Sequence, residues 1–171
     1  MRIIKVLLLA IVIFLASFFY QRNETQEQLE EPILSKINWN KPSVKMYFAV
    51  KKYSAKYKVP ERMAFSLAYQ ESRYQGPNHL AYVPEHISPS GALGPMQIMP
   101  GSARRFVPGK FSEYRLLHDI EYNVETSMRM LSFLRRKYGS WERAAGAYNT
   151  GQPIINGYSI FVTGNKFTWK K

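Results

Sequence analysis

The chain of 171 residues contains no cysteine. It therefore forms no disulfide and offers neither a thiol nucleophile nor a lipidated N-terminal cysteine. Its three histidines, His79, His86 and His118, do not have the spacing of metal ligands. The sequence also lacks a phosphate-binding glycine loop and a Gly-x-Ser-x-Gly nucleophile motif. We therefore expect no metal and no cofactor.

Acidic residues are scarce in this chain. It has 12 Asp and Glu against 24 Lys and Arg, a formal net charge of +12, and most of the excess lies after residue 42. Such a balance favours a polyanionic partner: nucleic acid, acidic lipid or an acidic cell-wall polymer. The basic residues form separate clusters rather than the dense stripe of a nucleic-acid-binding module, so we expect no nucleic-acid partner. An apolar content of 46% is sufficient for a folded core.

The N-terminus has the layout of an export signal. Arg2 and Lys5 precede an apolar run over residues 6–20. With its flanking residues this run reaches about 18 residues, close to the length of a membrane span. No small-x-small cleavage site follows it, which favours an uncleaved signal anchor over 1–20 rather than a removed signal peptide. The positive end should remain in the cytoplasm, so the rest is expected in the cell envelope, on the periplasmic side of the inner membrane.

Residues 21–42 are polar and acidic and are interrupted by Pro32 and Pro42, which is typical of a linker. Residues 43–171 form the expected domain, and apolar stripes at helical spacing predict that it is mainly α-helical. Helices are expected from 43, from about 61 to 71, over 119–138 and over 141–148. The segment 72–93, rich in glycine and proline, predicts a long functional loop. A β-hairpin is predicted from 158–162 and 166–169.

One carboxylate falls where an apolar residue is expected. Ala64, Leu67, Ala68 and Glu71 follow the spacing i, i+3, i+4, i+7, which places Glu71 on the apolar face at the end of its helix. A carboxyl group that loses water there has a raised pKa. It can then be protonated near neutral pH, as an acid that cleaves glycosidic bonds must be. Spacing alone leaves open a solvated glutamate at a helix end.

Standard glycosidases use two carboxylates, so such an enzyme would require a second acidic residue near Glu71. Glu85, in the long loop, is the only acidic residue between Glu71 and Glu113. Its surroundings are more typical of a solvated loop charge than of a catalytic base.

Three sequence blocks carry a family resemblance. They read Ala-Tyr-Gln-Glu-Ser at 68–72, Ser-Pro-Ser-Gly-Ala-Leu-Gly-Pro-Met-Gln-Ile-Met-Pro at 88–100, and Ala-Ala-Gly-Ala-Tyr-Asn-Thr-Gly at 144–151. In this order they resemble the signature blocks of soluble-type lytic transglycosylases, relatives of goose-type lysozyme. Asp119 and Asn123 resemble the Asp-x-x-x-Asn of that family. The resemblance covers about residues 45 to 151 and implies a lysozyme-like helical fold with a glycan-binding groove.

The resemblance also implies a chemistry in which Glu71 is the single catalytic acid/base. In this family one glutamic acid protonates the oxygen between N-acetylmuramic acid and N-acetylglucosamine of peptidoglycan. The resulting carboxylate takes a proton from the 6-hydroxyl of the same sugar, which closes into a 1,6-anhydro end. No water is consumed, so no second carboxylate is needed to activate one.

Further site residues are carried over from the same blocks as implied substrate-binding positions. Ser72 would help to orient the carboxylate. The others are the loop serines Ser88 and Ser90, the groove-floor residues Met96 and Gln97, and Tyr148 and Asn149 near the cleaved bond.

The chain departs from the family pattern in three places. The segment before Ser88 is longer than usual and contains Tyr82, which would be able to close over a bound sugar. Pro95 replaces the common leucine, and the tail after Gly151 differs from the usual helical C-terminus.

Two other interpretations stay open at this point. One is a hydrolysing lysozyme with Glu85 as its base, and the other is a non-catalytic protein that binds the cell wall or serves secretion-system assembly. The expected partners are peptidoglycan glycan strands, the membrane, and a secretion or envelope assembly.

Overall fold

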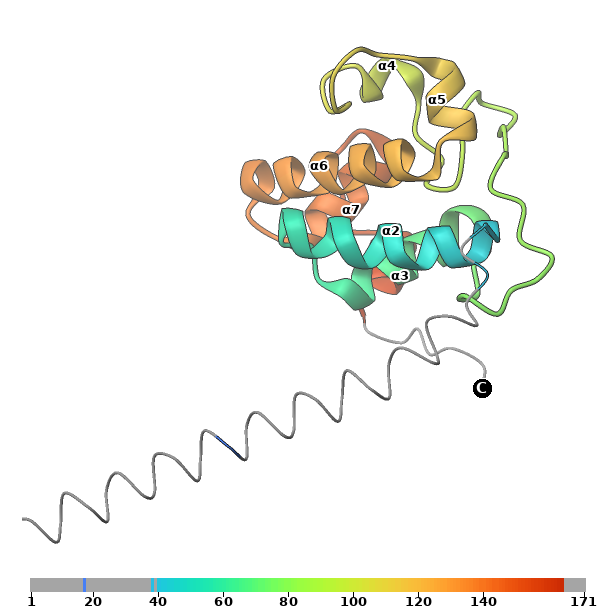
Figure 1. The fold of residues 1–171 in the computed structure, drawn as a ribbon. Coiled ribbons are helices and arrows are strands. Elements are labelled where there is room, and N and C mark those ends of the chain that lie inside the picture. The colour runs from blue at the N-terminus through green and yellow to red at the C-terminus, as the bar shows by residue number, and fades with distance from the viewer. Residues whose placement is uncertain (1–16, 18–37, 39, 165–171) are drawn as a thin grey trace, which may run out of the picture. The chain divides into compact units, whose positions relative to one another are not determined.

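The computed structural model describes residues 17, 38 and 40–164 (Figure 1). The chain divides into two units, Met1–Asn38 and Trp39–Lys171. The predicted signal anchor over 1–20 and most of the predicted linker lie outside the described residues. Among the helices that are described, none is both long enough and apolar enough to cross a membrane.

The second unit is built from helices, as the sequence predicts. In chain order they are α2 (Pro42–Tyr57), α3 (Glu61–Ser72), α4 (Pro100–Ala103), α5 (Glu113–His118), α6 (Ile120–Tyr138), α7 (Trp141–Thr150) and α8 (Gly157–Thr163). The four helices expected from apolar spacing correspond to α2, α3, α6 and α7. The short helices α4 and α5 were not predicted.

Helix α6 is the centre of the unit and packs against α2 and α7 (Figure 1). Its stripe of Val124, Met128 and Leu131 is fully buried. The side chain of Asp119 caps its first turn by accepting a hydrogen bond from the Tyr122 amide at 3.0 Å. Gly139 ends the helix with a positive φ of 80°, a conformation that favours glycine.

The predicted hairpin is wrong where the structure describes it, because residues 158–162 belong to α8. Asn156 and Ser159 form a capping box: the Asn156 side chain accepts from the Ser159 amide at 2.9 Å, and the Ser159 hydroxyl accepts from the Asn156 amide at 2.9 Å. Burial of Val162 holds the helix on the domain. The second predicted strand, 166–169, lies outside the described residues.

A long loop joins α3 to α4, as predicted. Between residues 73 and 99 its only β-pairing is two isolated bridges, Ile87 with Leu93 and Leu93 with Ile98. The bridges fold the signature block at 88–100 back on itself, so that its serines and glutamine lie near the end of α3.

Candidate active site

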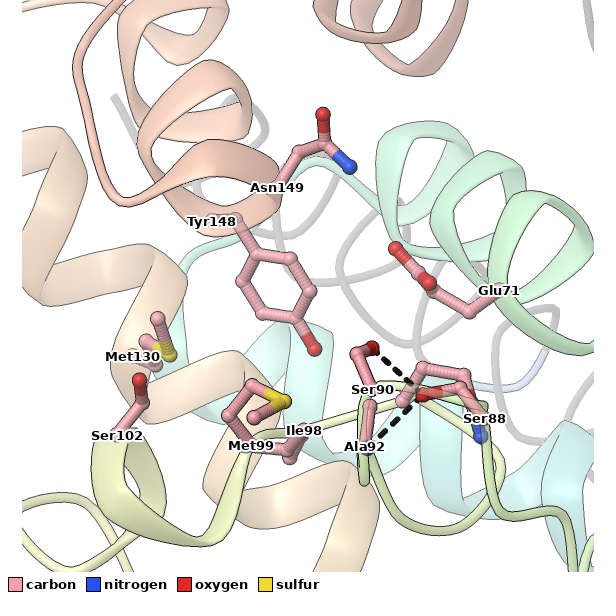
Figure 2. A pocket seen from close by; sticks show the side chains of 11 residues that line it. Glu71, Ser88, Ser90, Ala92, Ile98, Met99, Ser102, Met130, Tyr148 and Asn149 are labelled. Carbon is pink, nitrogen blue, oxygen red and sulfur yellow. Dashed lines mark hydrogen bonds between the residues drawn. The ribbon is translucent and has the colours of Figure 1, made fainter.

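A hollow of about 220 Å³ opens at the C-terminal end of α3 (Figure 2). Its walls come from α3, the long loop, α4, α6 and α7. It brings together most of the predicted site residues: Glu71, Ser88, Ser90, Gln97, Tyr148 and Asn149. Segments far apart in the sequence therefore meet around one carboxylate.

The carboxyl group of Glu71 faces this hollow from the end of α3 (Figure 2). Burial raises its pKa from 4.5 to about 7, and a hydrogen bond from Tyr158 partly opposes the rise. The predicted raised pKa of Glu71 is thus confirmed, with burial as its main cause. At neutral pH the protonated and ionised forms are present in comparable amounts, so the group can both give and take a proton.

Tyr158 is a site residue that the sequence analysis missed. Its hydroxyl donates to Oε1 of Glu71 from helix α8. Burial and the neighbouring Glu71 charge raise the pKa of Tyr158 well above its ordinary value, so the hydroxyl stays protonated and acts as a donor. The signal that would have found it is the Asn-x-x-Ser capping pattern at 156–159, which marks a helix start rather than a strand.

Gly146 allows α8 to reach α3. A Cβ at this position would lie 1.9 Å from the carbonyl oxygen of Ile154. Only glycine therefore permits the segment that precedes α8 to cross α7 so closely. The Gly in the third signature block thus helps to bring Tyr158 to Glu71.

Tyr148 forms another wall of the hollow and is itself firmly held. Its hydroxyl donates to the Met96 carbonyl at 2.7 Å and lies 3.0 Å from the Ser127 hydroxyl. Burial, together with the Glu71 charge, raises the pKa of Tyr148 well above its usual range. The hydroxyl is therefore a neutral link between α7, the signature loop and α6.

The serine loop lies across the hollow from Glu71 (Figure 2). The Ser88 hydroxyl accepts from the Ala92 amide at 2.9 Å and lies 2.9 Å from the Ser90 hydroxyl. Gln97 closes the same loop, because its Nε2 donates to the carbonyls of His86 at 3.0 Å and of Gly94 at 2.8 Å. Hydroxyl and amide groups are thus fixed at the hollow, where they can bind sugar hydroxyls and acetamido groups.

The signature loop is anchored to α6 by one buried side chain, Asn123. Its Oδ1 accepts from the Met96 amide at 2.9 Å, and its Nδ2 donates to the carbonyls of Leu93 at 2.9 Å and Leu116 at 2.7 Å. Gly94 fits against it with a φ of 72°, and a Cβ there would lie 2.2 Å from the Leu116 carbonyl oxygen. The Asp-x-x-x-Asn pattern therefore has a structural basis: the first residue caps α6 and the second holds the loop.

Two predicted site residues, Met96 and Ser72, do not line the hollow. The Met96 side chain is fully buried in the core, so the expectation that it forms the groove floor is not met. The Ser72 hydroxyl, predicted to orient Glu71, instead donates to the Ala68 carbonyl at 3.1 Å and lies 3.0 Å from the Tyr82 hydroxyl.

Tyr82 is likewise buried. Its ring packs edge-on against Tyr74 with the centroids 4.9 Å apart. It belongs to the core rather than to a flap over the hollow, contrary to the expectation that it would close over a bound sugar.

Glu85 is exposed and lines a different hollow, which it shares with Lys45, His118 and Glu121. No acidic side chain other than Glu71 lines the Glu71 hollow in the part of the chain that the structure describes. Within these same residues, no group of three or more His, Asp or Glu side chains is arranged to hold a metal ion.

The helical domain matches a known protein family. A family model described as the transglycosylase SLT domain matches residues 48–159. The chain belongs to this family. Its match runs from α2 into α8 and includes every residue that lines the Glu71 hollow.

Curated relatives of this SLT domain chain are much longer proteins. The soluble lytic murein transglycosylase of Escherichia coli strain K12 is 35% identical over 107 residues, which is 59% of this chain and 15% of that protein. The protein of the same name from Escherichia coli O157:H7 matches equally. The chain therefore spans about one-seventh of the length of these relatives.

Solved structures show the same helical domain. The 70 kDa soluble lytic transglycosylase of Escherichia coli aligns with a TM-score of 0.51 and 32% identity over 68% of this chain and 18% of that one. A complex of the 70 kDa soluble lytic transglycosylase with bulgecin A aligns with a TM-score of 0.50 and 31% identity over the same shares of the two chains. The lytic transglycosylase Slt of Pseudomonas aeruginosa aligns with a TM-score of 0.50 over 76% of this chain and 22% of that one. At 21% sequence identity, it supports the fold alone. The predicted lysozyme-like helical SLT domain is thus confirmed.

Proposed function

We propose that this chain is a peptidoglycan lytic transglycosylase that cleaves the bond between N-acetylmuramic acid and N-acetylglucosamine and leaves 1,6-anhydro ends. The observation that carries the proposal is Glu71, a single carboxyl group with a pKa of about 7 in a hollow that no other described acidic side chain lines. Relatives that bear the name lytic transglycosylase share the domain, which supports the same activity here.

The chemistry uses Glu71 twice. The protonated carboxyl first gives its proton to the glycosidic oxygen as the bond from that oxygen to the anomeric carbon breaks. The sugar's own 6-hydroxyl oxygen then bonds to the anomeric carbon, and its proton returns to Glu71. The acid is regenerated and no water is consumed. Because the 6-hydroxyl is tethered beside the reacting carbon, it needs no activating base beyond Glu71.

The proposed role of Tyr158 is to stabilise the carboxylate between these two steps. Its donated hydrogen bond favours the ionised form of Glu71 and thus offsets part of the effect of burial. Ser88, Ser90, Gln97 and Asn149 are proposed to bind the sugar hydroxyls and acetamido groups.

The substrate is extracytoplasmic, which agrees with the N-terminal sequence. We propose that residues 1–20 anchor the chain in the inner membrane, with the catalytic domain on the periplasmic side, where a secretion or envelope assembly would also be within reach. Fractionation followed by protease treatment of spheroplasts tests this location. Soluble protein with a new N-terminus after residue 17 or so would show a cleaved signal instead.

The activity is tested by digesting purified sacculi with the full chain, with and without EDTA, and weighing the products by mass spectrometry. We expect anhydromuropeptides, one water lighter than hydrolysed products, and no effect of EDTA. Hydrolysed ends would establish a lysozyme, and a chain that binds sacculi without releasing fragments would establish a wall-binding protein. Glu85, the base that the lysozyme alternative requires, lines a different hollow, which disfavours that alternative.

A further inference from the structure

Two methionines form part of the wall of the Glu71 hollow. Met99, near the end of the signature loop, and Met130, on α6, both line it (Figure 2). A thioether has no proton to give or take, so neither side chain carries out the acid/base steps assigned to Glu71. The sulfur atoms have a chemistry of their own, however, because peroxides convert methionine to methionine sulfoxide.

Exposure to solvent separates Met99 from every other methionine that the structure describes. The Met99 side chain belongs to a residue that is 43% exposed, whereas Met130 is 9% exposed. The others are fully or almost fully buried: Met46, Met63, Met96 and Met128. Because the chain contains no cysteine, no thiol competes with these sulfur atoms for an oxidant. Met99 is therefore the described thioether that a peroxide in solution reaches most easily.

The backbone fixes Met99 at the edge of the hollow. Its carbonyl oxygen accepts hydrogen bonds from the amides of Ser102 and Ala103, both at 3.0 Å, and so starts the first turn of α4. On its other side, Ile98 is buried and forms a β-bridge with Leu93. A chemical change at the Met99 sulfur is therefore made at the hollow itself.

Met130 lines the same hollow but lies in a different environment. It belongs to a buried cluster with Leu134, Ala144 and Ala147. These neighbours shield its side chain from solvent, although the residue still contributes to the wall near Glu71. The chain thus contains a matched control for Met99: a second thioether at the same hollow with far less access to an oxidant.

Oxidation of Met99 adds one oxygen atom to this wall. The sulfur forms a bond to one oxygen of hydrogen peroxide, the oxygen–oxygen bond breaks, and the other oxygen leaves as water. The sulfur is oxidised by two electrons and the peroxide is reduced by two. The product is larger than the thioether and is polar. In a hollow of about 220 Å³, it competes with a sugar for space and replaces an apolar contact surface with a dipole.

We propose that Met99 is an oxidation site through which peroxides reversibly weaken the activity of the Glu71 hollow. Methionine sulfoxide reductases return the sulfoxide to the thioether, so the modification can be undone. The effect on cleavage rests on the proposed function, whereas the order in which the methionines are oxidised does not. A domain without cysteine would in this way respond to oxidants through a thioether.

The first experiment follows oxidation and activity together in the full chain. Hydrogen peroxide is added in steps, peptide mass spectrometry measures the sulfoxide at each methionine, and digestion of sacculi gives kcat/KM. We expect Met99 to be oxidised before Met130, and kcat/KM to fall about tenfold in step with it, as for the loss of an apolar contact with the sugar. Methionine sulfoxide reductase should restore the rate. Oxidation of Met130 as fast as Met99, or full activity with Met99 completely oxidised, would overturn the proposal.

Two variants assign the loss of activity to one sulfur atom. Met99→Leu and Met130→Leu each replace a thioether with an apolar side chain that a peroxide does not oxidise. Each variant is compared with its own untreated sample, so that a changed starting rate does not affect the result. Met99→Leu should keep its rate after peroxide treatment, whereas Met130→Leu should lose activity as the wild type does. Equal losses in the wild type and Met99→Leu would place the damage at another residue and refute the role of Met99.

A binding measurement makes the test independent of cleavage. The Glu71→Gln full chain is sedimented with sacculi before oxidation, after oxidation and after treatment with the reductase. We expect oxidation to lower the bound fraction and the reductase to restore it. Binding that stayed the same with Met99 completely oxidised would contradict competition between the sulfoxide and the sugar. If the untreated wild type cleaved no sacculi, the proposed function would fail, while the order of oxidation and this sedimentation would still decide the role of Met99.

Discussion

Glu71 and Glu125 are both largely removed from water, yet their pKa values move in opposite directions. Burial acts to raise the pKa of Glu125 too, but hydrogen bonds from Lys56 and Tyr57 outweigh it and hold this pKa below its ordinary value. Among the residues that the structure describes, Glu71 has one neutral donor, Tyr158, and no salt bridge to a cation, so burial prevails and its pKa rises to about 7. The carboxylate of Glu125, paired with Lys56, stabilises the packing of α2 against α6. The carboxyl group of Glu71 has no such cation and therefore retains its proton to a higher pH.

The sharpest test of this contrast removes each carboxyl group in turn. We expect Glu71→Gln to abolish release of anhydromuropeptides, a loss of at least about 10²–10⁴-fold, because an amide can neither give nor take the required proton. Glu125→Gln, the matched change in the other carboxylate, should keep most of the activity. Rates are measured on sacculi, with circular dichroism to verify folding. A folded Glu71→Gln chain with near-normal turnover would disprove the single-acid mechanism.

A second change acts on the partner of Glu71. Tyr158→Phe removes the hydrogen bond that stabilises the carboxylate, so the pKa of Glu71 should rise further and the alkaline limb of the pH–rate profile should move to higher pH. The rate at the optimum should fall about tenfold, since the carboxylate that forms on proton transfer loses a donor. An unshifted profile would show that Tyr158 has only a packing role.

The pH dependence of the free energy of unfolding should distinguish Glu71 from Glu125 without any substrate. The pKa of Glu71 is raised by folding, so wild-type stability falls as pH rises from about 4.5 through 7. Glu71→Gln should therefore become more stable than the wild type above pH 7, by at most roughly 3 kcal/mol. The pKa of Glu125 is lowered, so Glu125→Gln should be less stable at neutral pH and the difference should shrink as pH falls below 4.5. Urea unfolding at pH 4 and pH 8 measures the free energy of unfolding of each variant relative to the wild type. If this difference changed with pH in the same direction for both variants, the opposite pKa shifts of Glu71 and Glu125 would be contradicted.

The smallest effect is expected at Glu85. Glu85→Gln should keep most of the rate and the same anhydro products, because its side chain lines a separate hollow. Loss of activity as complete as in Glu71→Gln, together with hydrolysed ends in the wild type, would establish the lysozyme alternative.

The regular parts of the fold were predictable because their apolar residues follow helical spacing. The α6 stripe of Val124, Met128 and Leu131 is buried as expected, and the position of Glu71 on an apolar face correctly predicted its raised pKa. Spacing along one helix determines which face is buried, and that information is local. The signature blocks then identified most of the residues that line the Glu71 hollow.

The errors arose where distant contacts decide the structure. The aromatic and β-branched residues of 158–162 favour a strand by composition, but the Asn156 capping box and the burial of Val162 stabilise a helix. The family resemblance places Met96 in the groove, yet the three hydrogen bonds of Asn123 hold its loop against α6 and its side chain lies in the core. The Asn-x-x-Ser pattern at 156–159 is a local signal for the helix start, whereas sequence spacing contains no information about the contacts of Asn123 with a loop some 30 residues away.

The hydrogen bond between Tyr158 and Glu71 joins residues that are 87 positions apart in the chain. During synthesis Glu71, the proposed general acid, is therefore made long before its donor, and the environment that sets its proton affinity is completed only after α8 has emerged and docked. A nascent chain halted before Gly157 would carry all three signature blocks and still lack a finished acid. The order of synthesis thus delays full activity until nearly the whole domain has been made.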